Sequence, residues 1–273
     1  MMPRVFGSKR GIVACGLLLT SGLAGAAQST ANLSGIAHVA IRVADLERSR
    51  AFFRKLGFEE AFAMESAAGC CRCGWVHACL LRGGGHHAVY QDYVGHGLAP
   101  TPVKRAGAGN LLFTLQGPEE PGAPSDLRGA ATQNIEYTQY MPGSKHTLDR
   151  GQHLGPDRIA QRIVGVGIPM ADPAAATAFY TDKLSFERGV RPLEPGYTAL
   201  ALPGLPAQQV EIMPASAGAT PNALPFHLIF SVADLRSIEE RLRSLGLTSR
   251  QYAKTLMIED PDGDEIVFVA RSE

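Results

Sequence analysis

Three segments of this chain show alternating apolar and polar residues, which predict a strand, and each is followed by a predicted helix. In HVAIRVADL, Val39, Ile41 and Val43 are apolar at every second position, which is the pattern of a strand with one buried face. GVGIPMADP and HLIFSVADL repeat the same transition from a strand through an aspartate into a helix. The apolar residues that follow have helical spacing and predict helices over 46–56, 174–184 and 235–245.

The first two copies of this pattern belong to a longer internal repeat. Asp45 and Asp172 lie 127 residues apart, and the aromatic pairs that follow them keep the same offset. A repeat of this length indicates two equivalent parts of one architecture. It predicts a first half over residues 35–158, of which 142–158 is a linker, and a second half over 162–273.

Strand alternation assigns the polar residues of these segments to one face. His38 and Arg42 face away from the helix-packing side of the first strand, and His227 does so in the third. Both histidines precede the aspartate of their copy by seven residues, and Gly165 holds this place in the second copy. Histidines and an arginine on the face opposite the packing layer imply a solvated or ligand-lined cavity.

The stretch between about 100 and 160 interrupts the repeat. It is rich in glycine and proline, with one clear strand at Leu111–Leu115 before strand character resumes at Ile135–Tyr140. It offers no room for a normal helix, so we expect four strand–helix–three-strand modules of which the second is shortened. Three glycines before His86 and His87 predict a hairpin turn that leads into a strand.

The first residues have the layout of a secretory signal peptide. Basic residues come first, an apolar run spans 11–23, and Ala24-Gly25-Ala26 forms a small-residue cleavage site. Residues 1–27 are therefore a predicted cleaved signal peptide, and the mature chain is expected in the periplasm or outside the cell. The apolar run is too short for a membrane span. A lipoprotein modified at Cys15 or an uncleaved anchor is the alternative.

Charge and composition exclude two further classes of function. The chain has 26 basic and 26 acidic residues, and residues 1–27 carry three basic and no acidic ones, so the 246 residues after them have a net charge of −3. No basic cluster interleaved with aromatic residues is present, so nucleic-acid binding is not expected. No second long apolar run is present, so no membrane span is expected in the mature chain.

Four cysteines remain after the signal peptide, namely Cys70, Cys71, Cys73 and Cys79. An even number in an exported chain favours disulfides, whose pairing the sequence leaves undecided. With His77 the group could instead bind zinc. Its spacing favours disulfides or free thiols over that metal site.

Four segments together resemble the vicinal oxygen chelate superfamily, which includes glyoxalase I, bleomycin-resistance proteins and extradiol dioxygenases. They are GIAHVAIRVADLERSRAFFRKLGF, ADPAAATAFYTDKLSF, FHLIFSVADL and IEDPDGDEIVF. The resemblance implies an α+β fold of tandem βαβββ modules paired into two cupped mixed sheets. It also implies a divalent metal (Fe, Mn, Ni or Zn) and a small-molecule ligand inside a cup. A shortened second module would open the first cup to a partner chain, so a homodimer is one expectation.

In this family the metal ligands come from the first and last strands of each module. The positions that match are His38 and Glu136 in the first half, and Glu211 and His227 in the second. Candidate acid–base groups are Glu136 and Glu211, and candidate substrate-binding residues are Arg42, Asn110 and Gln91. Asn110 stands where the second histidine of the first half is expected, while Gly165 and Val267 replace ligands in the second half. The linker histidines His146 and His153 are expected to be solvated.

Because the metal-ligand sets are incomplete, three functional hypotheses follow, which differ in whether the protein binds a metal or a ligand. We predict an exported small-molecule-binding protein whose metal sites are partly eroded, in the way that bleomycin-resistance proteins sequester ligands in the cup. The alternative is a metal-dependent lyase, isomerase or dioxygenase, in which a metal chelates neighbouring substrate oxygens and a glutamate moves a proton. A structural or partner-binding protein without a cup ligand is the third hypothesis.

Overall fold

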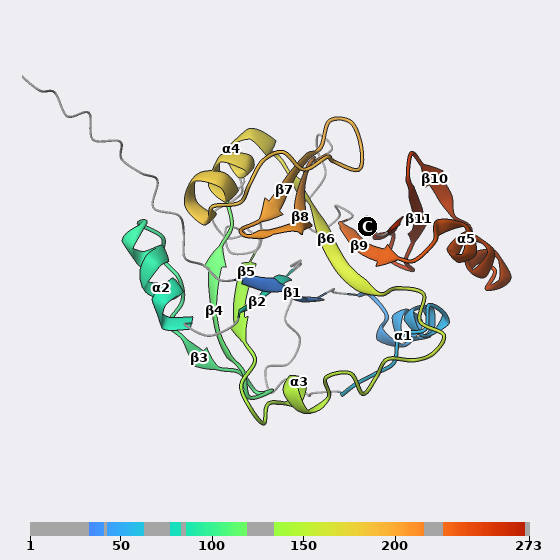
Figure 1. Cartoon of the computed structure of the whole chain (residues 1–273), viewed down its shortest axis with the longest axis horizontal. Helices are drawn as coiled ribbons and strands as arrows, with labels where there is room; N and C mark the ends of the chain where they lie inside the picture. The colour runs from blue at the N-terminus through green and yellow to red at the C-terminus, as the bar shows by residue number, and fades with distance from the viewer. Residues whose placement is uncertain are drawn as a thin grey trace, which may run out of the picture.

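The computed structural model describes residues 33–40, 43–62, 77–82, 86–118, 134–215 and 226–270, with the backbone alone at 40, 77–82 and 134. The elements in chain order are β1 (Leu33–Ala40), α1 (Leu46–Lys55), β2 (His77–Arg82), α2 (His86–Gly95), β3 (Lys104–Arg105), β4 (Leu111–Gln116), β5 (Asn134–Gln139), α3 (Lys145–Leu148), β6 (Arg162–Met170), α4 (Pro173–Ala178), the π-helical turn η1 (Phe179–Lys183), β7 (Thr198–Leu202), β8 (Leu205–Pro214), β9 (His227–Val232), α5 (Leu235–Ser244), β10 (Arg250–Tyr252), β11 (Thr255–Glu259) and β12 (Glu265–Ala270). These strands form two mixed sheets, which confirms the expected α+β class (Figure 1).

The aspartate at the end of each repeated segment is the N-cap of a helix. Asp45, Asp172 and Asp234 each accept a hydrogen bond from a backbone N–H three residues further on, at 3.0, 2.9 and 2.8 Å. A carboxylate in this place satisfies a free N–H group of the first turn and interacts favourably with the helix dipole. The three predicted helices are confirmed as α1, α4 continued by η1, and α5.

The second sheet is built from two paired modules. Its strand order is β10-β11-β12-β9-β6-β8-β7, with β6 and β9 antiparallel at the centre. β8 runs parallel to β6, and β12 runs parallel to β9, so each module closes beside its own first strand. α4 contacts β7 and β8, and α5 contacts β11 and β12. Both helices lie on the same face of the sheet, because Ala176 of α4 and Leu242 of α5 belong to one core cluster with the sheet residues Val166 and Phe268.

The first sheet differs from the expected one in which module is short. Its order is β1-β2-β5-β4-β3, so β2, α2, β3, β4 and β5 form a complete module arranged like β9, α5 and β10 to β12. The prediction of a shortened second module is therefore wrong. The first module is the short one: β2 begins 22 positions after α1 ends at Lys55, whereas β9 begins 44 positions after η1 ends at Lys183. The antiparallel pairing of β1 with β2, which repeats that of β6 with β9, decides this assignment.

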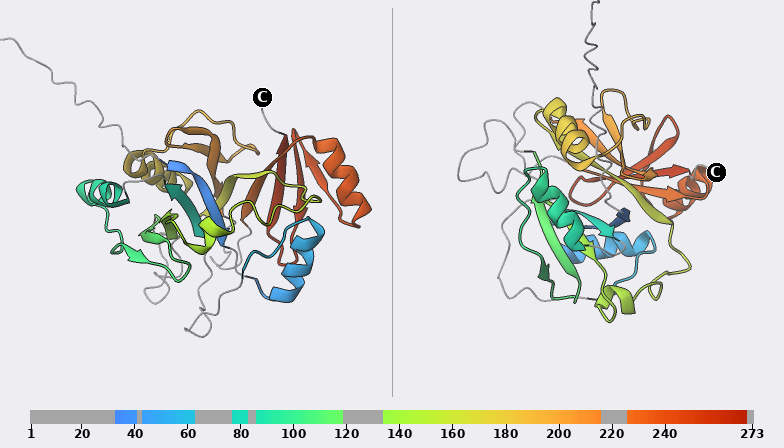
Figure 2. Two further views of the ribbon diagram at one scale, coloured as in Figure 1. Left: turned by 60° about the horizontal axis from the view of Figure 1, so that its bottom comes forward. Right: turned by 60° about the vertical axis from the view of Figure 1, so that its left-hand side comes forward.

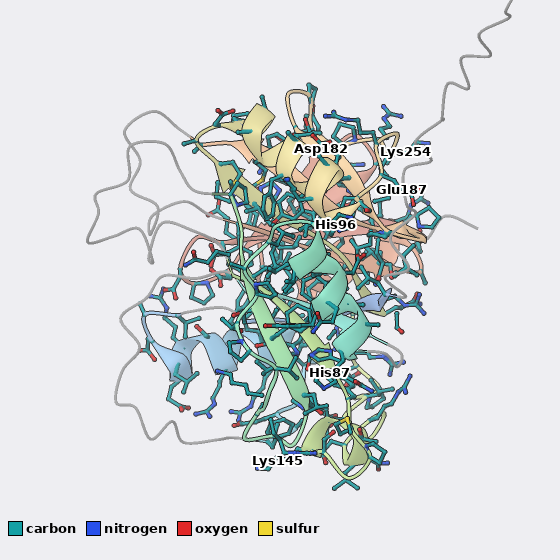
Figure 3. The ribbon with its side chains drawn as sticks, turned by 90° about the vertical axis from the view of Figure 1, so that its left-hand side faces the viewer. His87, His96, Lys145, Asp182, Glu187 and Lys254 are labelled. Atoms are coloured by element: carbon teal, nitrogen blue, oxygen red, sulfur yellow. The ribbon has the colours of Figure 1, made fainter. Side chains whose placement is uncertain are left out.

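Helix α2 replaces the strand that was expected after the three glycines. Val89 and Tyr93 are spaced by one helical turn and are both buried. Tyr93 donates a hydrogen bond from its hydroxyl to that of Tyr137 at 2.8 Å, which fixes the helix on β5. The strand prediction for His86 and His87 is therefore wrong: His86 is buried against the Phe113 ring, while His87 is exposed (Figure 3).

The helix-facing sides of both sheets share one hydrophobic core. Phe113 and Tyr137 of the first sheet belong to it together with Val166 and Phe268 of the second. α2 covers one face of β4 and β5, as the second view of Figure 2 shows. None of the helices in the described part of the chain is long and apolar enough to cross a membrane.

Candidate functional site

We call the face of the second sheet opposite α4 and α5 the second cup. Strand pairing places two rows of residues across it. The polar row consists of Glu211, Gly167, His227 and Glu265 on β8, β6, β9 and β12. The next row consists of Gln209, Gly165, Ile229 and Val267 on the same strands. The register therefore brings the two predicted ligands of the second half, Glu211 and His227, onto one line.

His227 is held by a carboxylate that the sequence did not single out. His227 is 3% exposed, and its Nε2 forms an ion pair and hydrogen bond with Glu265 Oε2. Arg250 donates to the other oxygen of Glu265. The hydrogen bond from His227, with the charges of His227 and Arg250, holds the pKa of Glu265 below its usual range despite burial. The parallel pairing of β12 with β9 brings Glu265 beside His227, and no local sequence pattern predicts that pairing.

Glu211 is a buried carboxyl group whose pKa is shifted in the opposite direction to that of Glu265. It is 0% exposed, and its Oε1 accepts hydrogen bonds from the Leu193 N–H at 2.6 Å and from Gln209 Nε2 at 3.0 Å. Oε2 is buried without a hydrogen-bond partner among the described residues, as is Nδ1 of His227. Burial raises the pKa of Glu211 to about 7, against the opposing effects of the Leu193 hydrogen bond and His227. Glu211 can therefore gain or lose a proton near neutral pH.

A cavity of about 920 Å³ lies on the second cup beside Glu211. Its wall includes Leu193 and Gln209, which donate to Glu211, and Ile229 of the second row. Ile229, Met257 and Val267 pack together as a small apolar cluster in the floor of the cup. A cavity of this size, with apolar walls and a few polar groups, is typical of small-molecule sites.

We call the face of the first sheet opposite α2 the first cup. His38 on β1 and Glu136 on β5 lie on either side of β2, in register with Cys79. Their side chains approach to 4.0 Å between His38 Nε2 and Glu136 Oε1. The two predicted ligands of the first half are therefore close together.

His146 joins the first cup from helix α3. Its ring stacks on those of His38 and Tyr140, at centroid distances of 5.8 and 4.9 Å. Asn110 Nδ2 lies 2.9 Å from His146 Nδ1. Burial lowers the pKa of His146, although the carboxylates of Asp149 and Glu136 favour its charged form. The expectation that His146 is a solvated linker residue is wrong, because the linker turns back over the sheet.

Backbone pairing makes position 77 the counterpart of position 227. His77 pairs with Asn134 and Ala40 as His227 pairs with Glu265 and Gly167. The same correspondence matches His38 with Gly165, and Glu136 with Val267. The second histidine position of the first half is thus His77, and the prediction that Asn110 occupies it is wrong.

Of the predicted substrate-binding residues, Gln91 lies away from the first cup and Asn110 contacts His146, while Arg42 is outside the described residues. Gln91 is exposed on α2, which covers the opposite face of the first sheet, so its predicted place on a cup strand is wrong. Asn110 is buried and its Oδ1 accepts from the Met141 N–H at 3.4 Å, so it supports the loop around His146. Arg42, the cysteines Cys70, Cys71 and Cys73, and the predicted signal peptide lie outside the described residues.

The two cups differ in how their donors fit a metal. Among the described side chains, no three His, Cys, Asp or Glu converge on one point. In the second cup Gly165 and Val267 bring no donor atom, and Arg250 and N–H groups engage the carboxylates, so a metal does not fit there. In the first cup, His38 and Glu136 at 4.0 Å suit two ligands of one ion, given metal–ligand distances of about 2 Å.

Comparison with known proteins identifies the two halves. The model for the bleomycin resistance protein-like N-terminal family matches residues 36–69. The model for the glyoxalase, bleomycin resistance protein and dioxygenase superfamily matches residues 162–268. A search of the curated proteins finds no match.

Solved structures with the same fold are extradiol-type dioxygenases. Homoprotocatechuate 2,3-dioxygenase from Arthrobacter globiformis is 14% identical, over 88% of this chain and 80% of that chain, with a TM-score of 0.56. A catechol 2,3-dioxygenase is 14% identical, over 89% of this chain and 90% of that chain, with a TM-score of 0.58. At these identities the likeness concerns the fold. The dioxygenase structures share the fold of this chain, and the family models identify both of its halves, at residues 36–69 and 162–268, as belonging to the glyoxalase, bleomycin resistance protein and dioxygenase superfamily, also known as the vicinal oxygen chelate superfamily.

Proposed function

We propose that this protein is an exported small-molecule-binding protein whose ligand occupies the second cup without a metal. The observation that carries the proposal is the cavity of about 920 Å³ on the cup face. Its floor is formed by the apolar side chains of Val164, Ile229 and Val269 on β6, β9 and β12, and the neighbouring Gly165 and Val267 supply no metal ligand. Such a floor favours burial of an apolar ligand surface at about 25 cal/mol per Å².

The buried groups beside this cavity support a binding role that is independent of a metal. Glu211 is held by Leu193 and Gln209, and Glu265 by His227 and Arg250. These contacts hold both carboxyl groups in place within the protein, while Oε2 of Glu211 has no hydrogen-bond partner among the described residues. Glu211, whose pKa is raised to about 7, lies behind the cavity wall, because its hydrogen-bond donors Leu193 and Gln209 line the cavity.

Filling the cavity tests this proposal. Ala207 is exposed on β8 and lines the cavity, so Ala207→Trp places an indole in it without disturbing the core. Native mass spectrometry of wild-type protein purified from the periplasm is expected to show a co-purified small molecule that the variant lacks. Ala174→Trp, at an exposed position on α4, is the matched control and should retain it. Retention of the same molecule by Ala207→Trp would contradict the proposal.

A second candidate function rests on the register of the first sheet. His38, His77 and Glu136 hold the positions of two histidines and one carboxylate, the ligand set of non-haem iron oxygenases. A metal bound there would supply Lewis-acid chemistry towards neighbouring substrate oxygens. Glu136 could then hold or move a proton, and the stacked His146 and Tyr140 would exclude water from one side.

Metal content distinguishes this candidate from a metal-free protein. The protein would carry serine at Cys70, Cys71, Cys73 and Cys79, so that thiolates bind no ion. Near-stoichiometric iron, manganese, nickel or zinc that is lost in His38→Ala and kept in the linker control His153→Ala would support the enzyme. Absence of metal after incubation with each ion would exclude it.

Two further expectations about the protein in the cell remain predictions. Cell fractionation is expected to recover a mature chain that begins after residue 27 in the periplasm or the medium. Sedimentation analysis of the purified protein will show whether it forms the predicted homodimer.

A further inference from the structure

The cavity of the second cup is lined by three arginines from three separate segments. Arg158 comes from the linker, Arg162 is the first residue of β6, and Arg191 lies between η1 and β7. Among the described residues that line the cavity there is no aspartate and no glutamate. A concentration of one charge sign in a cavity raises the local concentration of ligands of the opposite sign.

The carboxylates nearest to these arginines along the chain form ion pairs with other arginines. Asp157 pairs with Arg241 at 3.7 Å, and Glu194 pairs with Arg250 at 3.8 Å. Arg158 donates from Nη1 to the carbonyl oxygens of Leu154 and Gly155, at 3.3 and 3.2 Å. These two bonds orient its guanidinium and use one nitrogen. Within the described residues, the charges of the three arginines are therefore not balanced by ion pairs.

The rest of the cavity wall is mainly apolar. The apolar side chains that line the cavity include Val164, Val190, Leu193, Ile229 and Val269. Gln161, Gln209 and Ser231 add neutral polar groups. A ligand that matches both parts has an apolar body and one anionic group, because guanidinium groups bind carboxylates in a planar, bidentate way.

We propose that the ligand of the second cup is an organic anion, with its anionic group held by Arg158, Arg162 and Arg191 and its apolar body on Ile229, Leu193 and Val269. This proposal rests on the proposed binding function and names the class of ligand. Glu211 lies behind this wall, because its hydrogen-bond donors Leu193 and Gln209 line the cavity.

Paired probes test the charge requirement. Benzoate, phenylacetate, 4-phenylbutyrate and octanoate would each be compared with the neutral amide of the same skeleton by isothermal titration calorimetry. The best carboxylate is expected to bind at least tenfold more tightly than its amide. Arg162→Gln and Arg191→Gln should each weaken that carboxylate about tenfold and leave the amide unchanged, because a charge-assisted hydrogen bond is lost. Binding should also weaken in 0.5 M salt.

Control variants separate the failure of this proposal from that of the binding function. Arg188→Gln removes an exposed arginine that does not line the cavity and should have no effect. Equal binding of acids and amides, blocked by Ala207→Trp and insensitive to the arginine variants, would overturn the anion proposal while the binding function stands. Binding of no probe, charged or neutral, would overturn both.

Discussion

At the scale of single residues, the second cup holds two carboxyl groups with opposite protonation behaviour. Glu265 accepts hydrogen bonds from His227 and Arg250, and these contacts hold its pKa below its usual range. Glu211 is fully buried, and its pKa is raised to about 7 because desolvation outweighs its hydrogen bonds. The pKa values of the two carboxyl groups are therefore shifted in opposite directions.

Replacing Glu211 should change how stability depends on pH. The folded pKa of about 7 lies above the ordinary value of 4.5, so the folded state binds the proton more tightly than the unfolded chain. The stabilising contribution of this proton is complete below pH 4.5 and is lost as the pH rises through 7. Glu211→Gln should therefore be more stable than wild type at pH 8, by up to ~3 kcal/mol, and similar to it near pH 5.

Urea unfolding at pH 5 and pH 8 measures this difference. Glu240→Gln, an exposed position on α5, is the control and should shift stability equally at both values. A Glu211→Gln variant whose stability relative to wild type is the same at pH 5 and pH 8 would argue against a proton on Glu211.

At the scale of elements, β6 depends on glycine because two strands approach it closely. A Cβ atom at position 167 would lie 2.8 Å from the Cβ of His227 and 3.0 Å from Met213 Sδ. A Cβ atom at position 165 would lie 2.9 Å from Ile229 Cδ1. The present packing of β8 and β9 therefore leaves no room for a side chain at either position of β6.

Gly167→Ala should destabilise the protein because the Cβ atom of the buried His227 must move to make room for the added methyl group. We expect the free energy of unfolding to fall by about 1–3 kcal/mol, the usual cost of overpacking. Gly95→Ala, at the end of α2 with no atom within 4 Å of the added Cβ, is the matched control and should be neutral or slightly stabilising. Equal urea midpoints for Gly167→Ala and wild type would show that β6 has more room than its contacts imply.

At the scale of the whole molecule, Gln208 links the two halves. Its side chain is 8% exposed, accepts a hydrogen bond from the Ile36 N–H at 3.1 Å and donates one to the Ile163 carbonyl at 3.0 Å. Gly35 makes room for it, since a Cβ there would lie 2.7 Å from Gln208 Oε1. The amide thereby joins β1 of the first half to β6 of the second.

Gln208→Leu should weaken the association of the halves because two backbone groups lose their partner. Each buried unsatisfied group costs about 1–3 kcal/mol, so the free energy of unfolding should fall by at least ~2 kcal/mol. Hydrogen exchange should increase at the amide of Ile36, while Gln251→Leu, exposed on β10, should change neither quantity. Unchanged exchange at Ile36 would mean that this link contributes little.

Several features of the structure could not be predicted from the sequence, because they depend on contacts between distant segments. Helix α2 was mistaken for a strand because its pattern is short and follows three glycines, and the burial of Val89 and Tyr93 against the sheet decides its form. His146 was assigned to solvent because nothing local to the linker shows that it folds back onto His38. Glu265 and His77 gained their significance from strand pairing with distant segments.

The repeated strand-to-helix transitions, their aspartate caps and the family follow from the residue order, because periodicity and capping act over a few neighbouring residues. The same patterns assign His38 and Glu136, and Glu211 and His227, to cup-facing strand positions. Only the tertiary fold shows which module is short, which carboxylate holds His227, and that three arginines line one cavity. These features depend on pairing and burial between residues far apart in the chain, and local patterns carry no information about such partners.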